Sequence, residues 1–185
     1  MGYERALIKA WSELRALSQE RTFSVKFLAD TYDLDVSSGS ILSLSCNIPA
    51  KDYQAILILH YLITKLRLGR LPENTGEWID FNQLDGGDAY YSVFRKRTIN
   101  PIITKYGHDP MSLLKVCERL PASIMDVGDA SLLITVFEGV NVRITLWKGD
   151  EEFGPDANIL FDRTIKEIFC TEDIVVLSEY IARSI

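Results

Sequence analysis

Five carboxylates gather in the segment WKGDEEFGPDANILFD, which runs from Trp147 to Asp162. Oxygen-rich side chains of this kind can bind a hard divalent cation, or can act as the acid and base of a reaction. The candidates are Asp150, Glu151, Glu152, Asp156 and Asp162. Their spacing does not match an EF-hand loop, which alternates its ligands around a central glycine. The segment is therefore either a site for a ligand or partner, or a charged turn.

The same segment contains two turn signals, which favour the second interpretation. The pairs Gly149-Asp150 and Gly154-Pro155 are typical of tight turns, where an aspartate accepts hydrogen bonds from nearby backbone N–H groups. If the negative charge matters in its own right, Asp150 and Glu152 are the residues expected to supply it, as acid–base or metal-binding groups. The sequence leaves both interpretations open.

A pocket lined by aromatic side chains is a further possibility. Trp78, Tyr90, Tyr91 and Trp147 could enclose a small ligand, with Arg95 meeting an anionic group. Aromatic side chains in such positions are more often core than pocket residues. The candidate binding residues are therefore Trp147, Asp150, Glu151, Glu152, Asp162, Trp78, Tyr91 and Arg95.

Most other familiar chemistry has no motif in this sequence, which contains no Gly-rich phosphate loop, no GxSxG elbow and no HExxH. The two histidines, His60 and His108, belong to different predicted elements, although His108 could still lie beside Cys117 in space. The remaining cysteines are Cys46 and Cys170, and no CxxC pair exists, so we expect no zinc or iron–sulfur cluster held by this chain. We therefore expect no metal site, and no cofactor can be assigned.

Length and charge limit the class of protein. With 185 residues, 47% of them hydrophobic and 25% charged, the chain is predicted to form one globular domain over residues 1–185. Its net charge of −6 argues against nucleic-acid binding, which requires a basic excess. Residues 148–185 contain nine acids and four bases, whereas residues 89–108 contain four bases and no acid. These two segments either pair internally or form a bipolar surface for a partner.

Nothing in the sequence predicts a membrane protein. The start of the chain, MGYERALIKAWSEL, is charged throughout, unlike the apolar region of a signal peptide. The most apolar run, AILILHYLI, is far shorter than the roughly 20 residues that span a bilayer. We therefore expect a cytoplasmic protein that binds a protein partner or a small ligand, of unknown oligomeric state.

Periodicity predicts helices at both ends of the chain and after Pro49. Residues 3–18 repeat apolar side chains at helical spacing, and 51–68 are too long for a strand and end at Gly69. Asp88 and Asp109-Pro110 are predicted to begin shorter helices, and Thr171 to cap a final amphipathic helix. His60, inside the second helix, is expected to be buried and hydrogen-bonded.

Alternation predicts the strands. Residues 23–48 read as two strands joined by a Ser-Ser-Gly-Ser turn, the second with Leu42, Leu44, Cys46 and Ile48 on one face. One short strand follows Gly76, and a hairpin covers 131–147 with its turn near Gly139. These elements together predict an α+β fold, in which an antiparallel sheet built from hairpins is covered by several helices, with an amphipathic helix at the C-terminus.

Three groups of residues also carry a family resemblance. These are GEWIDF…L…GG…YY..F from Gly76 to Phe94, the pair Gly128-Asp129, and LW.GDEEF…A.ILFD…TED from Leu146 to Asp173. Together they resemble an uncharacterised family, a domain of unknown function that occurs mainly in anaerobic bacteria and archaea. Some longer relatives resemble corrinoid and carbon-monoxide-dehydrogenase accessory proteins in carrying an N-terminal four-cysteine iron–sulfur module. This sequence does not contain that module, so the resemblance implies no cluster here.

The resemblance implies a role but no reaction, since no activity is assigned to the family. The leading hypothesis is an accessory or binding domain in anaerobic metabolism that recognises a protein partner or cofactor through residues 147–162. The alternative is an enzyme that uses Asp150 and Glu152 on a small metabolite.

Overall fold

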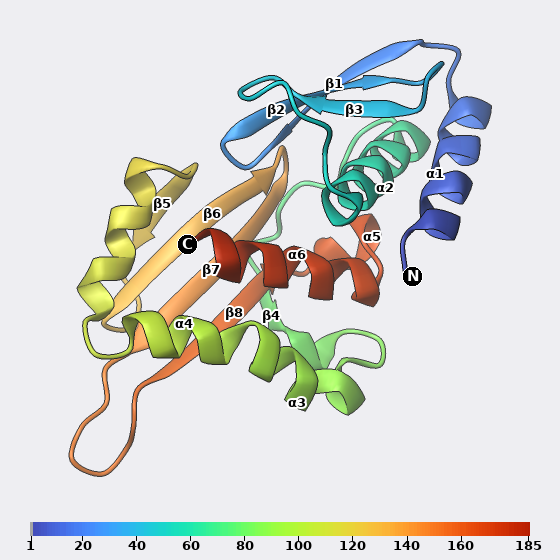
Figure 1. The fold of residues 1–185 in the computed structure, drawn as a ribbon. Coiled ribbons are helices and arrows are strands. Elements are labelled where there is room, and N and C mark those ends of the chain that lie inside the picture. Colours follow the sequence, from blue (N-terminus) through green and yellow to red (C-terminus); the bar gives the residue numbers. More distant parts are fainter. Residues whose placement is uncertain (1) are drawn as a thin grey trace.

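The computed structural model describes residues 2–185, which form an α+β fold with two antiparallel sheets (Figure 1). The helices are α1 Glu4–Leu17, α2 Asp52–Leu68, α3 Gly87–Arg97, α4 Ile99–Tyr106, α5 Ile165–Ile168 and α6 Thr171–Ser184, with 3₁₀ helices η1 Phe81–Gln83 and η2 Pro110–Glu118. The strands are β1 Thr22–Phe27, β2 Asp30–Asp35, β3 Ser40–Ser43, β4 Trp78–Asp80, β5 Ala122–Met125, β6 Ala130–Phe137, β7 Val140–Trp147 and β8 Asp156–Asp162. The predicted fold class is confirmed.

The small sheet has the order β1-β2-β3 and lies beside α1 and α2. The prediction of two strands here was wrong, because the chain also turns at Leu28, a residue that adopts a φ of +52° without being glycine. The predicted second strand ends early, at Ser43. Its inner face consists of Ile41 and Ser43, so Leu42 and Leu44 point into solvent instead of packing together.

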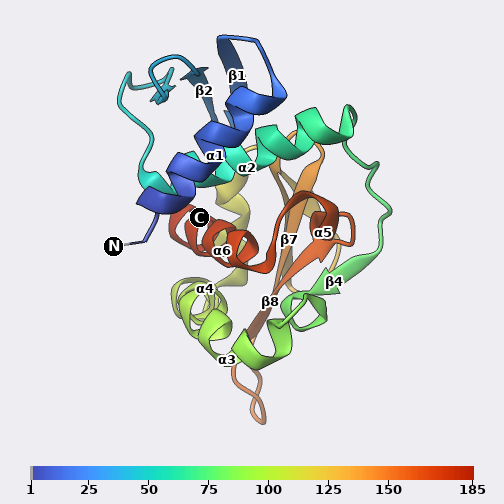
Figure 2. The ribbon, with the colours of Figure 1, turned by 90° about the vertical axis from the view of Figure 1, so that its right-hand side faces the viewer.

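The large sheet has the order β4-β8-β7-β6-β5, with every neighbouring pair antiparallel. Its inner face includes Val142, Ile144 and Leu146 of β7, which are fully buried, as their alternation predicted. Figure 2 shows α3, α4 and α6 on this side of the sheet. The opposite side, called here the outer face, carries Leu133, Arg143 and Leu160 in register across β6, β7 and β8, and all three are only half-buried.

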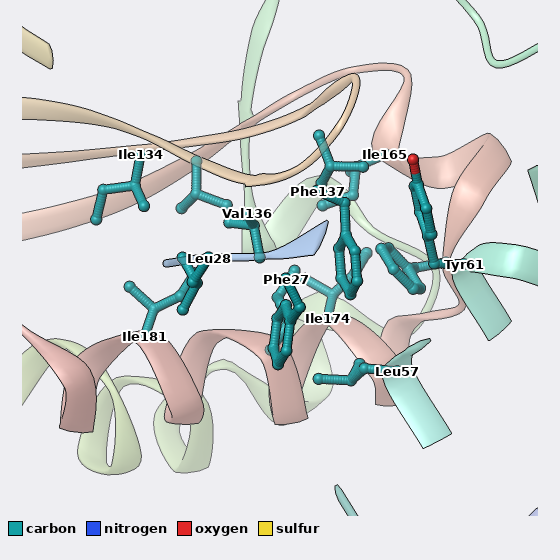
Figure 3. Close-up of a cluster of buried hydrophobic side chains, with 14 of the residues drawn as sticks. Phe27, Leu28, Leu57, Tyr61, Ile134, Val136, Phe137, Ile165, Ile174 and Ile181 are labelled. Carbon is teal, nitrogen blue, oxygen red and sulfur yellow. The ribbon is translucent and has the colours of Figure 1, made fainter. Parts of the chain in front are cut away.

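Aromatic rings join the two sheets into one core (Figure 3). Phe137, at the end of β6, stacks on Phe27 of β1 at 4.6 Å and on Tyr61 of α2 at 4.4 Å between ring centroids. Helix α6 packs into the same core through the stripe that the sequence predicted, namely Ile174, Leu177, Ile181 and Ile185. The amphipathic C-terminal helix is confirmed.

Two predicted helix caps were wrong. Gly86, in the left-handed conformation, occupies the N-cap of α3, and Asp88 lies inside the first turn. Cys170 occupies the N-cap of α6, and the Thr171 hydroxyl instead donates a hydrogen bond of 2.9 Å to the carbonyl of Asp85. Thr171 thus contacts a carbonyl that is distant in the sequence, which local sequence does not reveal.

His60 is hydrogen-bonded as predicted, but it is less buried than expected. Its Nδ1 lies 2.8 Å from Oδ2 of Asp173, and its side chain remains 34% exposed. Within residues 2–185, every helix is too short or too polar to cross a bilayer.

Candidate functional site in the β7–β8 hairpin

The acidic segment forms a hairpin that projects from the molecule. Strand β7 ends at Trp147, β8 begins at Asp156, and these two residues are paired in register. Figure 1 shows the loop between them, residues 148–155, extending beyond the end of the large sheet. The turns predicted from the sequence are present. Strand β8 was not predicted, because acidic residues stand at both of its ends. The candidate site is therefore a loop that connects two paired strands of a β-hairpin.

Asp150 organises this loop through the backbone. Its own N–H donates to the carbonyl of Phe153 at 2.8 Å, while its Oδ1 accepts hydrogen bonds from the N–H groups of Glu152 and Phe153 at 2.8 and 2.7 Å. These backbone donors, Phe153 first and Glu152 second, lower the pKa of Asp150. The Asp150 carboxylate therefore holds the turn in its charged form.

The base of the hairpin is fixed on both sides. On one side, the N–H of Lys148 donates to Oδ2 of Asp129 at 2.8 Å. Gly128, with a φ of +64°, is so close there that a Cβ would lie 2.6 Å from the methyl group of Thr145. On the other side Pro155 packs against Gly107, where a Cβ would lie 2.9 Å from the proline ring. The loop therefore extends from a packed base.

The acidic and aromatic side chains beside Asp150 in this loop point into solvent. Glu151 and Glu152 are exposed, and neither carboxylate forms an ion pair or hydrogen bond with any residue in 2–185. Phe153 is 70% exposed and Trp147 is 38% exposed. We call residues 150–153 the hairpin tip. It presents an apolar ring beside unpaired carboxylates, as protein-binding surfaces often do.

Asp162, at the far end of β8, has entirely different surroundings. It is 3% exposed, and its carboxylate accepts hydrogen bonds from the N–H and hydroxyl of Thr75, the N–H of Gly76, and the N–H and hydroxyl of Thr164. Burial alone would raise the pKa of Asp162, but the hydrogen bonds from Thr164, Thr75 and Gly76 outweigh it and the pKa is lowered. Asp162 fastens the loop before β4 to β8, and the whole strand separates it from the hairpin tip.

The structure does not gather the other predicted binding residues. Trp78 lies on β4, with its ring 4.8 Å from the guanidinium carbon of Arg143. Tyr91 and Arg95 belong to α3, on the inner side of the sheet. Arg95 donates to Asp156 at 2.7 Å, and this hydrogen bond raises the pKa of Arg95. The candidates thus divide between the two sides of the large sheet, without a shared pocket.

A groove of about 650 Å³ that the sequence did not predict lies between α3 and α6. Of the four aromatic candidates, Tyr90 lines it. Glu179 also lines the groove and accepts hydrogen bonds from Arg97 at 3.3 Å and Arg183 at 3.2 Å. Residues from separate parts of the chain form its walls, so only the four-residue spacing of Glu179 and Arg183 on one helix was visible beforehand.

The two oppositely charged segments of the sequence form ion pairs with each other at the protein surface. Arg95 pairs with Asp156 and Arg97 pairs with Glu179. These contacts support internal pairing of the basic and acidic segments. No group of three or more His, Cys, Asp or Glu side chains within residues 2–185 is placed to hold one metal ion.

A family model described as Domain of unknown function (DUF3786) matches residues 9–184. The chain belongs to this family. No curated protein and no solved structure matched it. In this DUF3786 domain, several residues that carried the resemblance have folding roles: the Gly76 N–H and Asp162 tie a loop to β8, Asp129 holds the hairpin base, and Phe81 stacks on Phe94 at 4.0 Å.

Proposed function

We propose that this DUF3786 domain is an accessory binding domain that docks a protein partner through its hairpin tip. One observation carries the proposal: the tip projects from a fixed base and exposes Phe153 beside two carboxylates, Glu151 and Glu152, that have no hydrogen-bond or ion-pair partner within residues 2–185. A buried aromatic anchor surrounded by charged residues is a common arrangement in protein interfaces. The family resemblance supports a partner in anaerobic metabolism.

The chemistry of the tip indicates the kind of partner. The ring of Phe153 requires an apolar recess, and the carboxylates of Glu151 and Glu152 require lysine or arginine side chains around it. Rim charges of this type mainly increase the association rate and make it sensitive to salt. Binding should therefore weaken as ionic strength rises.

The enzyme alternative has less support from the geometry. A general acid at neutral pH needs a raised pKa, whereas the backbone hydrogen bonds lower the pKa of Asp150. Asp150 and Glu152 are also both exposed on a projecting loop, where water would screen their charges. An exposed loop is accessible to a protein partner, whereas the same exposure would weaken acid–base or metal-binding chemistry by these carboxylates.

The test is affinity capture from an anaerobic source, followed by reconstitution with the purified candidate partner. The Glu151→Gln/Glu152→Gln/Phe153→Ala variant should lose binding at least tenfold relative to the wild type. The Glu20→Gln/Glu118→Gln variant is the matched control, because both glutamates are exposed and neither forms an ion pair in the part of the chain that the structure describes. Equal affinity of all three proteins would rule out the tip as the docking site. Metal analysis and an absorbance spectrum of the anaerobically purified protein would expose a cofactor-dependent role.

A further inference from the structure

The outer face of the large sheet contains an arginine that is positioned but unpaired. The guanidinium of Arg143 lies over the ring of Trp78, with its carbon 4.8 Å from the ring centroid. Its Nε is buried without a hydrogen-bond partner, and within residues 2–185 no carboxylate lies within ion-pair distance of it. Desolvation lowers the pKa of Arg143, so the cation is less well solvated than in water. A carboxylate approaching from outside would meet a preordered cation.

Apolar side chains surround this cation. Leu133, Leu160 and Trp78 are half-buried on the outer face, and Trp147 and Val127 are more exposed at the end nearest the hairpin. An apolar centre with one unpaired arginine is the complement of the hairpin tip, which has one exposed ring and unpaired carboxylates. The molecule thus carries both halves of an interface.

The spacing of the two halves suits a two-fold axis. Arg143 precedes Trp147 by four residues, and Glu151 follows it by four. Along β7, at about 3.3 Å per residue, Arg143 lies roughly 13 Å from Trp147. Glu151 lies on the other side of Trp147, in the loop that continues from the end of β7 (Figure 1). A two-fold axis passing near Trp147 would bring the hairpin tip of each copy toward Arg143 of the other, so that the contact is made twice.

We infer that the outer face of the large sheet is the docking surface for the hairpin tip of a second copy of this chain. This inference rests on the proposed function, because it names a partner for the same tip. It also assigns a role to Trp78 and Arg143, which the tip alone leaves unexplained. Isologous dimers of this kind use each contact twice.

Charge reversal tests the inference directly. Sedimentation velocity of the wild type at low salt, over about 1 to 500 μM, should show a reversible dimer. Arg143→Glu alone should be monomeric, since the introduced carboxylate would oppose the acidic tip at both contacts. Glu151→Lys/Glu152→Lys alone should also be monomeric, because the lysines would oppose Arg143.

Mixing the two variants gives the decisive result. In an equimolar mixture, the introduced carboxylate of one chain meets the introduced lysines of the other, while the unchanged Arg143 of the second chain meets the unchanged tip of the first. The mixture should therefore form a heterodimer although each variant is monomeric, and its formation also shows that both variants are folded. Arg143→Glu mixed with Glu20→Lys/Glu118→Lys is the control: the second protein keeps both halves of the interface and should dimerise with itself, whereas Arg143→Glu should remain monomeric and enter no heterodimer.

A wild type that stays monomeric over this range, a dimer that neither variant weakens, or a mixture that does not associate would each overturn the inference. The proposed function would survive such a result if the tip variant still lost its heterologous partner in the reconstituted assay. It would fail separately if that partner bound the tip variant as well as the wild type.

Discussion

The two ends of the Trp147–Asp162 segment place the same kind of side chain in opposite surroundings. At the β8 end, Asp162 is buried and accepts hydrogen bonds from two residues of a distant loop and from Thr164. At the hairpin tip, Asp150 accepts two local backbone hydrogen bonds, and Glu151 and Glu152 accept none from within residues 2–185. One end is tied to the fold and the other is available to a partner.

This difference shows that residue type alone does not separate a structural carboxylate from a recognition carboxylate. What separates them is the number of hydrogen-bond donors within the fold that point at the carboxylate. A carboxylate with several buried donors cannot be neutralised without leaving those donors unsatisfied. A carboxylate without donors can be neutralised at little cost to the fold, so its charge is free to serve binding.

The largest loss of stability is expected for substitution of Asp162. We expect Asp162→Asn to lower the free energy of unfolding by about 3 kcal/mol, because hydrogen bonds to a charged group contribute about 1.5–3 kcal/mol and several would be lost or reversed. The amide NH₂ would face the N–H of Gly76 or the donors of Thr75 and Thr164. Urea titration measures the change. An unaltered urea midpoint would mean that the hydrogen bonds to Asp162 do not stabilise the fold.

Acid should remove the same stabilisation. The folded-state pKa of Asp162 is lowered, so its contribution is fully present above the unfolded value of about 3.9 and is lost as pH falls through the folded pKa. The difference in unfolding free energy between wild type and Asp162→Asn should therefore be constant from pH 7 to 5 and shrink below about pH 4. Urea titrations of both proteins at each pH measure this difference. A difference that grew on acidification would contradict the assignment.

A smaller effect is expected where β8 begins. Arg95 and Asp156 form an exposed pair beside the base of the hairpin, and such pairs contribute about 0.2–1 kcal/mol. Arg95→Gln should cost no more than about 0.5 kcal/mol, and this cost should vanish in about 1 M salt, where charges are screened beyond about 3 Å. Arg70→Gln, which breaks an exposed pair far from the hairpin, is the control. A larger cost that persists in salt would indicate that Arg95 packs rather than pairs.

Much of the fold could be read from the sequence, because periodicity reports local burial. The alternation in β7, the turn at Gly139 and the stripe of α6 were all predicted and are all present. The turn at Leu28 was missed because an ordinary residue occupies a left-handed conformation there, held by a hydrogen bond from its N–H to Val136 across the core. That contact joins parts of the chain 108 residues apart, and no local pattern encodes it.

The candidate site could be predicted only in part, because several of its contacts also join distant parts of the chain. The turn-forming role of Asp150 follows from its neighbours, and the sequence offered it as one of two interpretations. The role of Asp162 depends on Thr75 and Gly76, which are more than 80 residues away. The stacking of Arg143 on Trp78 depends on the order of strands in the sheet, which alternation does not specify.

The smallest effect on stability, together with a full effect on binding, is expected at the tip. In Asp150→Asn/Glu152→Gln, the asparagine oxygen can still accept from the N–H groups of Glu152 and Phe153, so the turn should keep its hydrogen bonds. The Glu152 carboxylate has no partner among residues 2–185 to lose. The urea midpoint should therefore match that of the wild type, while affinity for the docking partner falls at least tenfold, because an amide cannot replace the charge that pairs with lysine or arginine. Unfolding or aggregation of this variant would show that the tip, like Asp162, belongs to the fold. Unchanged affinity would move recognition away from the tip and toward the groove beside Tyr90.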